Sequence, residues 1–290
     1  MLLSLKFVST ISYYNTRCSN LFEIQSFNSK KDYKAIIEIN NLVWPIKYTL
    51  DDLKQADQNR DPNRFFKRIV AIVRKKVVGY GIVRDPWEFT DPGYYAINLT
   101  VHPNYRRKGI GDALYEQLIK SLQHYQVDTI IAETYENMTD AVEFLEKRGF
   151  QITIRLPRSI LHLEEFHPQR FDSILEKVSG KGIRIVTVSK LATKDKNWKH
   201  KLWRLHVECM KDVPSTVELT EMPFEQYKQN VLDKLDLDYW VVALDGSELV
   251  GLSILWRDTA ELEKMYTSLT GVIRSHRRQK IATAMKIKLF

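Results

Sequence analysis

The sequence predicts an α/β (α+β) protein of two tandem domains, each with a mixed, mostly antiparallel sheet flanked by helices, the second one incomplete. Two observations predict this architecture. Segments with strand and helix patterns follow one another through residues 21–165 in the order βααβββαβαββ. The beginning of the same pattern then returns after residue 182. A repeat of this length indicates two related domains rather than a solenoid.

The repeat is clearest in a hairpin. The segment VAIVRKKVVGYGIV aligns without gaps with a later segment at an offset of 172 residues, so that Ala71 lies over Ala243 and Gly79 over Gly251. Each copy has β-branched residues on both sides of a two-residue turn, which we place at Lys75-Lys76 and at Gly246-Ser247. Both copies therefore predict two antiparallel strands.

The elements of the first copy can be placed in order. Pro45 ends the first helix, and Gly149 ends the last one. The longest helix has apolar residues at close to 3.6-residue spacing. We expect strands at 22–27, 68–74, 77–85, 94–101, 129–133, 150–155 and 160–163, and helices at 30–43, 50–59, 109–126 and 139–148.

Four segments follow from this pattern: a poorly ordered leader (1–20), the first domain (21–165), a linker helix (166–182) and a partial second domain (183–290). The leader has no basic region ahead of its apolar residues, which argues against a signal peptide. The chain has two cysteines, Cys18 and Cys209, and no apolar run long enough for a bilayer. We therefore expect a cytoplasmic protein without a structural disulfide and without membrane contact.

The stretch VHPNYRRKGIGDAL, from Val101 to Leu114, carries the clearest chemical signal. A strand leads into three cations and two glycines, and a helix follows. The first N–H groups of a helix lack internal partners, so this pattern is typical of an anion site that suits a pyrophosphate. Neither the dinucleotide fingerprint nor the P-loop pattern is met. The alternative is a solvated basic start of a helix.

The run from Arg106 to Gly111 resembles the R/Q-x-x-G-x-G/A acetyl-CoA loop of the GNAT acyltransferase superfamily. The later segment from Phe144 to Phe150, FLEKRGF, resembles the family's (F/L)-Y-x-K-x-G-F segment. The tandem layout resembles the two-domain GNAT proteins related to mycothiol synthase. The resemblance implies the acyltransferase fold and acetyl transfer from acetyl-CoA to an amine, without a metal.

The resemblance also assigns residues to the acetyl-CoA site. The loop would hold the pyrophosphate, the strand end at Val101 would pair with the pantetheine arm, and Asn137 would contact the same arm. The cofactor-binding residues expected from the resemblance are Val101, Arg106, Arg107, Lys108, Gly109, Ile110, Gly111 and Asn137.

The catalytic groups are less well defined by the sequence. Leu145 stands where the family usually has the tyrosine that protonates the departing thiolate. Tyr135 is a substitute for that acid, although a tyrosine at a strand end can simply pack. Glu133 is the preferred base, with Glu88 and Asp91 as further candidates. Each of these three carboxylates can also be an ordinary surface residue.

The second copy departs from the loop pattern. It retains Arg277 and Arg278, but Lys280 replaces the first glycine, and the chain reaches Phe290 soon afterwards. We expect that this domain does not bind CoA in the family's manner. Either the chain is a truncated product, or the half-domain serves as a lid or a dimerisation surface. A homodimer is therefore a candidate assembly.

We expect the first domain to be an N-acetyltransferase acting on a small-molecule or peptide amine. The alternative is a non-catalytic, acyl-CoA-binding or regulatory tandem protein. The net charge of +8, concentrated near the C-terminus, raises nucleic-acid binding as a third reading. That reading is disfavoured because aromatic residues are not interleaved with these cations.

Overall fold

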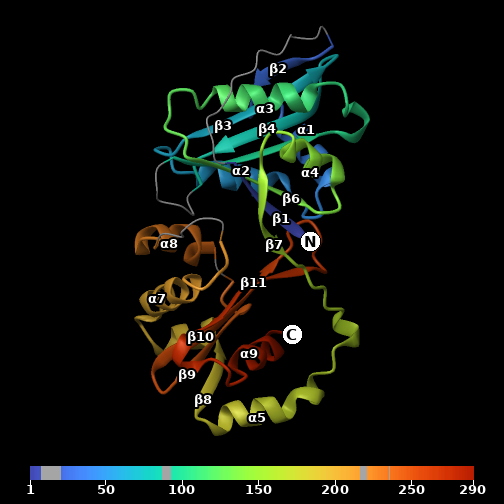
Figure 1. The fold of residues 1–290 in the computed structure, drawn as a ribbon. Helices are drawn as coiled ribbons and strands as arrows, with labels where there is room; N and C mark the ends of the chain where they lie inside the picture. The colour runs from blue at the N-terminus through green and yellow to red at the C-terminus, as the bar shows by residue number, and fades with distance from the viewer. Residues whose placement is uncertain (8–20, 87–92, 216–220, 235) are drawn as a thin grey trace. The chain divides into compact units, whose positions relative to one another are not determined.

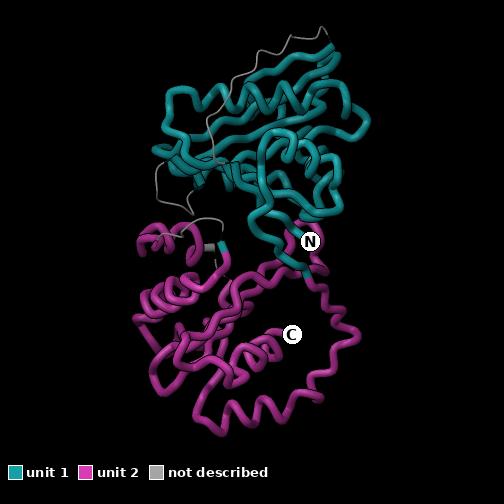
Figure 2. The backbone as a smooth tube through the Cα atoms, viewed as in Figure 1, with its two compact units in different colours: residues 1–158, 215–220 teal, residues 159–214, 221–290 magenta. Residues whose placement is uncertain are grey.

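The computed structural model describes residues 1–7, 21–86, 93–215, 221–234 and 236–290 (Figure 1). The chain divides into two compact units (Figure 2). Unit 1 is formed by residues 1–158 and 215–220, and unit 2 by residues 159–214 and 221–290. Each unit has its own sheet and its own buried core.

Unit 1 is built on a seven-stranded sheet in the order β2-β3-β4-β5-β6-β1-β7. All neighbouring strands are antiparallel except β5 and β6, which run parallel. The strands are β1 (Leu2–Phe7), β2 (Glu23–Ser26), β3 (Phe66–Val73), β4 (Lys76–Arg84), β5 (Tyr94–Val101), β6 (Thr129–Tyr135) and β7 (Gln151–Leu156). This agrees with the predicted mixed, mostly antiparallel sheet.

Helices cover both faces of this sheet, because successive strand residues point to opposite sides. On one face, α3 (Ile110–Lys120) buries Leu114 and Leu118 against β3 and β4, and α4 (Thr139–Glu146) adds Leu145 to the same core. On the other face, α1 (Tyr33–Val43) packs Ile36 against Val70 and Tyr80. The remaining helix, α2 (Leu50–Gln58), contacts α1.

Local sequence explains where these elements begin and end. Helix α1 ends at Val43 because Trp44 precedes a proline and is extended, with φ −93° and ψ 143°. Helix α2 begins with a capping box in which Thr49 and Asp52 exchange hydrogen bonds. The hairpin turn lies at Arg74-Lys75, one residue earlier than predicted, and both residues have positive φ.

The first strand corrects the prediction of a poorly ordered leader for residues 1–20. Leu2–Phe7 forms β1, which lies between β6 and β7 and is antiparallel to both. Leu3 and Leu5 are almost completely buried in the core of unit 1. A six-residue strand whose partners lie far along the chain leaves no local signal for its pairing. Residues 8–20, with Cys18, lie outside the described part of the chain.

Two further expectations differ from the structure. Residues 160–163 were expected as a strand, but they are irregular up to a short 3₁₀ turn at Leu163–Glu165. The expected linker helix is α5 (Asp172–Gly180), and it packs Val178 into a core cluster of unit 2. Its apolar face is buried in that core, so it belongs to unit 2 rather than to a separate linker.

Unit 2 has a four-stranded antiparallel sheet in the order β11-β10-β9-β8. Helices pack on both of its faces and enclose two core clusters. The strands are β8 (Ile183–Thr187), β9 (Trp240–Asp245), β10 (Glu248–Arg257) and β11 (Met265–Val272), and the further helices are α6 (Val188–Lys194), α7 (Trp198–Met210), α8 (Phe224–Asn230) and α9 (Ile281–Leu289).

The sheet of unit 2 repeats the strands β2 to β5 of unit 1 in register. Gly79 pairs with Val101 in unit 1, and Gly251 pairs with Val272 in unit 2. The next backbone hydrogen bond is also repeated, since His102 donates to the Val78 carbonyl and Ile273 to the Val250 carbonyl. The sequence repeat is therefore a structural repeat.

Candidate active site

The predicted anion loop of unit 1 connects β5 to α3. A short 3₁₀ turn (Pro103–Tyr105) follows the strand, and Arg107 and Gly109 both have positive φ, at 60° and 78°. The first helical hydrogen bond runs from Ala113 to the Gly109 carbonyl at 3.0 Å. The N–H groups of Ile110 and Gly111 precede that bond, so they have no partner within the helix and can bind an anion.

The space beside the first glycine of the loop is open. Apart from Gly109 itself and its two chain neighbours, no described atom lies within 4 Å of the position that a Cβ would take there. Arg106 donates through Nε to the Val101 carbonyl at 3.2 Å, and Lys108 donates to the Asn104 carbonyl at 3.1 Å. Within the described part of the chain, no acidic side chain forms an ion pair with the cations of this loop. The site therefore keeps its positive charge.

Gly111 has a different reason to be glycine. A Cβ at this position would lie 3.3 Å from the Phe144 ring of α4. Arg148 stacks on that ring, donates to the Phe144 carbonyl at 2.8 Å and pairs with Asp112 in the first turn of α3. The second glycine thus lets α4 pack against the start of α3.

A gap opens beside the loop, between the two parallel strands. The pairing of β5 with β6 stops at Ile97 and Ala132, although β5 continues to Val101 and β6 to Tyr135. Backbone groups of β5 beyond Ile97 that face β6 need partners, and an extended ligand with amide groups can supply them. Open α/β sheets bind ligands at the carboxyl ends of such strands.

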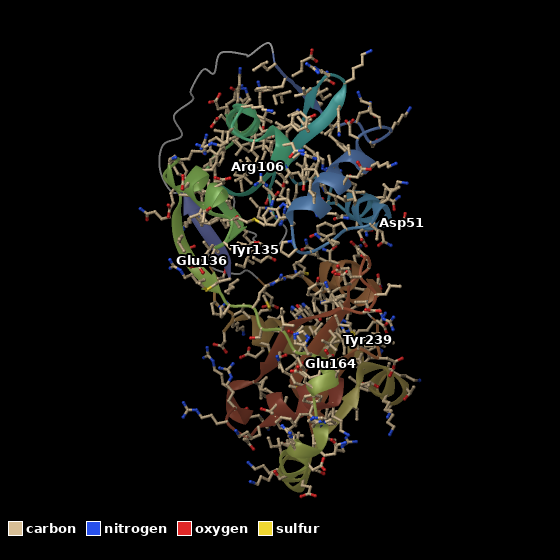
Figure 3. The ribbon with its side chains drawn as sticks, turned by 90° about the vertical axis from the view of Figure 1, so that its right-hand side faces the viewer. Asp51, Arg106, Tyr135, Glu136, Glu164 and Tyr239 are labelled. Carbon is tan, nitrogen blue, oxygen red and sulfur yellow. The ribbon has the colours of Figure 1, made fainter. Side chains whose placement is uncertain are left out.

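The predicted catalytic residues lie beyond this point on β6. Glu133 and Tyr135 alternate with the buried Thr134, so they share the face of the sheet that α1 covers. Glu133 is exposed, and Tyr135 is buried with 7 % of its surface accessible. Figure 3 shows Tyr135 beside Glu136 at the end of this strand. Asn137 is exposed in the turn that follows.

Comparison with known proteins identifies this arrangement. The model of the acetyltransferase (GNAT) family matches residues 33–150. The N-alpha-acetyltransferase of Saccharolobus solfataricus is 32% identical over 133 residues, which cover 41% of this chain and 75% of that protein. The chain belongs to the GNAT acetyltransferase family. The predicted family and the predicted acyltransferase class are thereby confirmed.

Solved GNAT structures confirm the fold of both units. A glucosamine N-acetyltransferase region of a fungal multi-domain β-N-acetylglucosaminidase superposes with a TM-score of 0.67 at 14% identity, over 97% of this chain. The match spans only 35% of that longer protein. A tandem GNAT protein from the clavulanic acid biosynthesis pathway superposes with a TM-score of 0.64 at 15% identity, over 92% of this chain and 83% of its own. The predicted tandem GNAT fold is therefore confirmed.

Leu145, which has no hydroxyl, stands at the position where the GNAT family usually has a tyrosine. Leu145 is 8% exposed and packs in the core of unit 1 with Leu114 and Phe150. Leu145 therefore cannot donate a proton. The two other candidate bases, Glu88 and Asp91, lie outside the described residues.

The structure adds residues that the sequence analysis did not single out. Trp44, just after α1, donates its indole N–H to Thr100 on β5 at 2.9 Å, and its ring lies 6.0 Å from that of Tyr135. Burial raises the pKa of Tyr48, and the nearby Asp52 and Tyr135 raise it further. Trp44 therefore contacts both β5 and the end of β6, close to the point where these two strands separate. The Trp-Pro signal predicted only the end of the helix.

The GNAT loop of unit 2 has the same backbone but different side chains. Arg278 and Lys280 have φ values of 61° and 66°, and Arg277 donates through Nε to the Val272 carbonyl at 2.9 Å, as Arg106 does in unit 1. Asp212, after α7, pairs with Arg277 and also with Arg274, the latter at 2.6 Å. Hydrogen bonds from both arginines lower the pKa of Asp212 to about 2. A carboxylate of the chain itself therefore offsets part of the positive charge of this loop.

The described residues contain no group of three or more His, Cys, Asp or Glu side chains placed to hold a metal ion. None of their helices combines the length and the apolar character needed to cross a bilayer.

Proposed function

We propose that unit 1 transfers an acetyl group from acetyl-CoA to the free amino group of a peptide. The observation that carries this proposal is the loop at the start of α3, with its accessible N–H groups and uncompensated cations, next to the gap between β5 and β6. The residues present fit acetyl-CoA, because the loop suits a pyrophosphate and the edge of β5 suits an amide-containing arm. The relative named an N-alpha-acetyltransferase supports a peptide α-amine over a small amine.

In this proposal the loop from Arg106 to Gly111 and the end of β5 at Val101 hold the donor, and Asn137 contacts its arm. Positioning of donor and acceptor supplies most of the rate enhancement. The amine nitrogen forms a bond to the thioester carbonyl carbon, and the carbon–sulfur bond breaks. Glu133 takes the proton that leaves the amine, and Tyr135 gives its phenolic proton to the departing thiolate.

Calorimetric titration of acetyl-CoA into the full chain tests the donor site. We expect one site per chain, because the loop of unit 2 has Lys280 at the first glycine position and a carboxylate, Asp212, paired with its arginines. Release of free thiol should then be measured with short peptides that differ in their first residue. A matched peptide with a blocked N-terminus and one internal lysine separates α-amine from side-chain acetylation. No acetyl-CoA binding, or two equal sites, would contradict the proposal.

The alternative function, an acyl-CoA-binding protein without catalysis, is favoured by Leu145 at the tyrosine position. The Tyr135→Phe variant separates the two. General acid catalysis contributes about a hundredfold or more, so we expect Tyr135→Phe to lower kcat by roughly that factor while acetyl-CoA binding is retained. Binding of acetyl-CoA by the wild type without thiol release from any peptide would favour the alternative.

A further inference from the structure

The Tyr135 hydroxyl accepts a hydrogen bond from a residue outside the regular elements of unit 1. Arg158 lies in the irregular chain after β7 and is exposed. Its Nη1 donates to the Tyr135 hydroxyl oxygen at 2.6 Å, and its guanidinium carbon lies 5.4 Å from the centre of the tyrosine ring. The guanidinium therefore contacts the hydroxyl end of the ring.

The direction of this hydrogen bond determines what the hydroxyl can still do. A guanidinium has five donors and no acceptor, so the Tyr135 oxygen is the acceptor and its own hydrogen is not used in the bond. The ring is also held in place by burial and by Trp44, which is itself fixed to Thr100. Arg158 therefore leaves the phenolic hydrogen available to another acceptor while it fixes the oxygen.

The positive charge of Arg158 also favours proton donation by the Tyr135 hydroxyl. When a phenol donates its proton, a phenolate remains, and a cation in hydrogen-bond contact stabilises that phenolate. Tyr135 is the last residue of β6, beyond the point where β6 leaves β5, so its hydroxyl lies at the strand end where the proposed transfer occurs.

We propose that Arg158 is a positioning residue for Tyr135, holding its hydroxyl as a proton donor and stabilising the phenolate that donation leaves. This inference rests on the proposed function, in which Tyr135 protonates the departing thiolate. Arg158 compensates in part for Leu145 of α4, because it adapts a tyrosine on another element, the strand β6, to the role of an acid.

The test compares Arg158→Met with Arg158→Lys in the full chain. The probes are acetyl-CoA and the peptide on which the wild type releases thiol fastest. We expect Arg158→Met to lower kcat about tenfold, a part of the effect of removing the acid itself, with KM for both substrates within about twofold. Lysine keeps one donor and the charge, so Arg158→Lys should recover most of the rate. Calorimetry should give an unchanged acetyl-CoA affinity for both variants.

Arg155→Met is the matched control. Arg155 is an exposed arginine of β7 that pairs at 3.7 Å with Glu136, the residue after Tyr135, so this variant removes the same charge near the end of β6 without touching the Tyr135 hydroxyl. We expect its kcat to equal that of the wild type. A loss as large as in Arg158→Met would show that only general surface charge matters, which would overturn the inference.

A double-mutant cycle separates the two proposals. In a Tyr135→Phe background, Arg158→Met should change kcat by less than about twofold, since no hydroxyl remains to be positioned. An equal loss in both backgrounds would mean that Arg158 acts on the acceptor itself, and would overturn its positioning role. A wild-type rate in Arg158→Met beside a slow Tyr135→Phe would overturn this inference alone. A wild-type rate in Tyr135→Phe would overturn the acid role as well.

Discussion

The loops at Gly109 and Lys280 share a backbone path but differ in what surrounds them. Each follows a strand and a short 3₁₀ turn, contains two residues of positive φ and leads into a helix. In unit 1 the first of the two glycine positions is a glycine facing open space. In unit 2 it is a lysine, and Asp212 pairs with the nearby arginines. The same loop backbone thus carries different side chains in the two units.

Exchanging the residue at the first glycine position should have the largest effect. Gly109→Lys places a side chain over the N–H groups of the loop, and losing hydrogen bonds to a charged group costs about 1.5–3 kcal/mol for each bond. We expect acetyl-CoA affinity, measured by calorimetry, to fall roughly a hundredfold. The variant should stay folded, because Lys280 already adopts φ 66° at the matched position in unit 2.

The reverse exchange, Lys280→Gly, is the control for that variant. It removes the lysine from unit 2 but leaves Asp212 in place, so one acetyl-CoA should still bind with unchanged affinity. Unchanged affinity in Gly109→Lys, or a second site in Lys280→Gly alone, would break the comparison between the two loops.

His206 of unit 2 is a group through which the stability of that unit depends on pH. Burial lowers the pKa of His206, on α7, to about 4, and its Nδ1 has no hydrogen-bond partner among the described residues. The unfolded state takes up this proton below about pH 6.5, whereas the folded state does so only near pH 4. The stability contribution of this neutral histidine is therefore fully present above pH 6.5, and it is lost as the pH falls towards 4.

Unfolding in urea, followed by tryptophan fluorescence at several pH values, checks this expectation. Four of the six tryptophans lie in unit 2, at positions 198, 203, 240 and 256, so the signal reports mainly on that unit. His206→Leu should reduce the loss between pH 6.5 and 4 by up to about 3 kcal/mol. An identical pH dependence in wild type and variant would show that the histidine contributes nothing.

The smallest effect is expected for Asp212→Asn. The two arginine pairs of Asp212 lie at the surface, where ion pairs stabilise little, so the melting temperature should fall by no more than about 2 °C. Arg274 and Arg277 then lack a counter-charge, and we expect weak binding of inorganic pyrophosphate that disappears at high salt. Pyrophosphate is titrated into Gly109→Lys and into the double variant Gly109→Lys/Asp212→Asn. The Gly109→Lys change weakens binding to unit 1, so the difference between the two titrations reports on unit 2. Equal, negligible binding in both would mean that the carboxylate does not separate the loops.

The sequence predicted those parts of the site whose signals are local. Cations, glycines and a helix start within one segment defined the loop, and the repeat exposed Lys280 as an exception. Contacts that depend on the path of the chain could not be predicted. Gly111 opposes Phe144, and Arg158 reaches Tyr135 from an irregular segment. Neither contact leaves a periodicity or a motif.

The largest error in the fold has the same cause. An isolated apolar hexapeptide is compatible with a leader or with a buried strand, and only its partners decide between them. For β1 these partners are β6 and β7, so Leu3 pairs with Thr134 and Arg155, more than a hundred residues away.

The central place of β1 has a consequence for how the protein is made. Its residues are synthesised long before their partners on β6 and β7, which extend to Tyr135 and Leu156. The strand must therefore wait, unpaired, until the chain has been synthesised at least as far as β6. At about 5–20 residues per second, this delay lasts on the order of ten seconds.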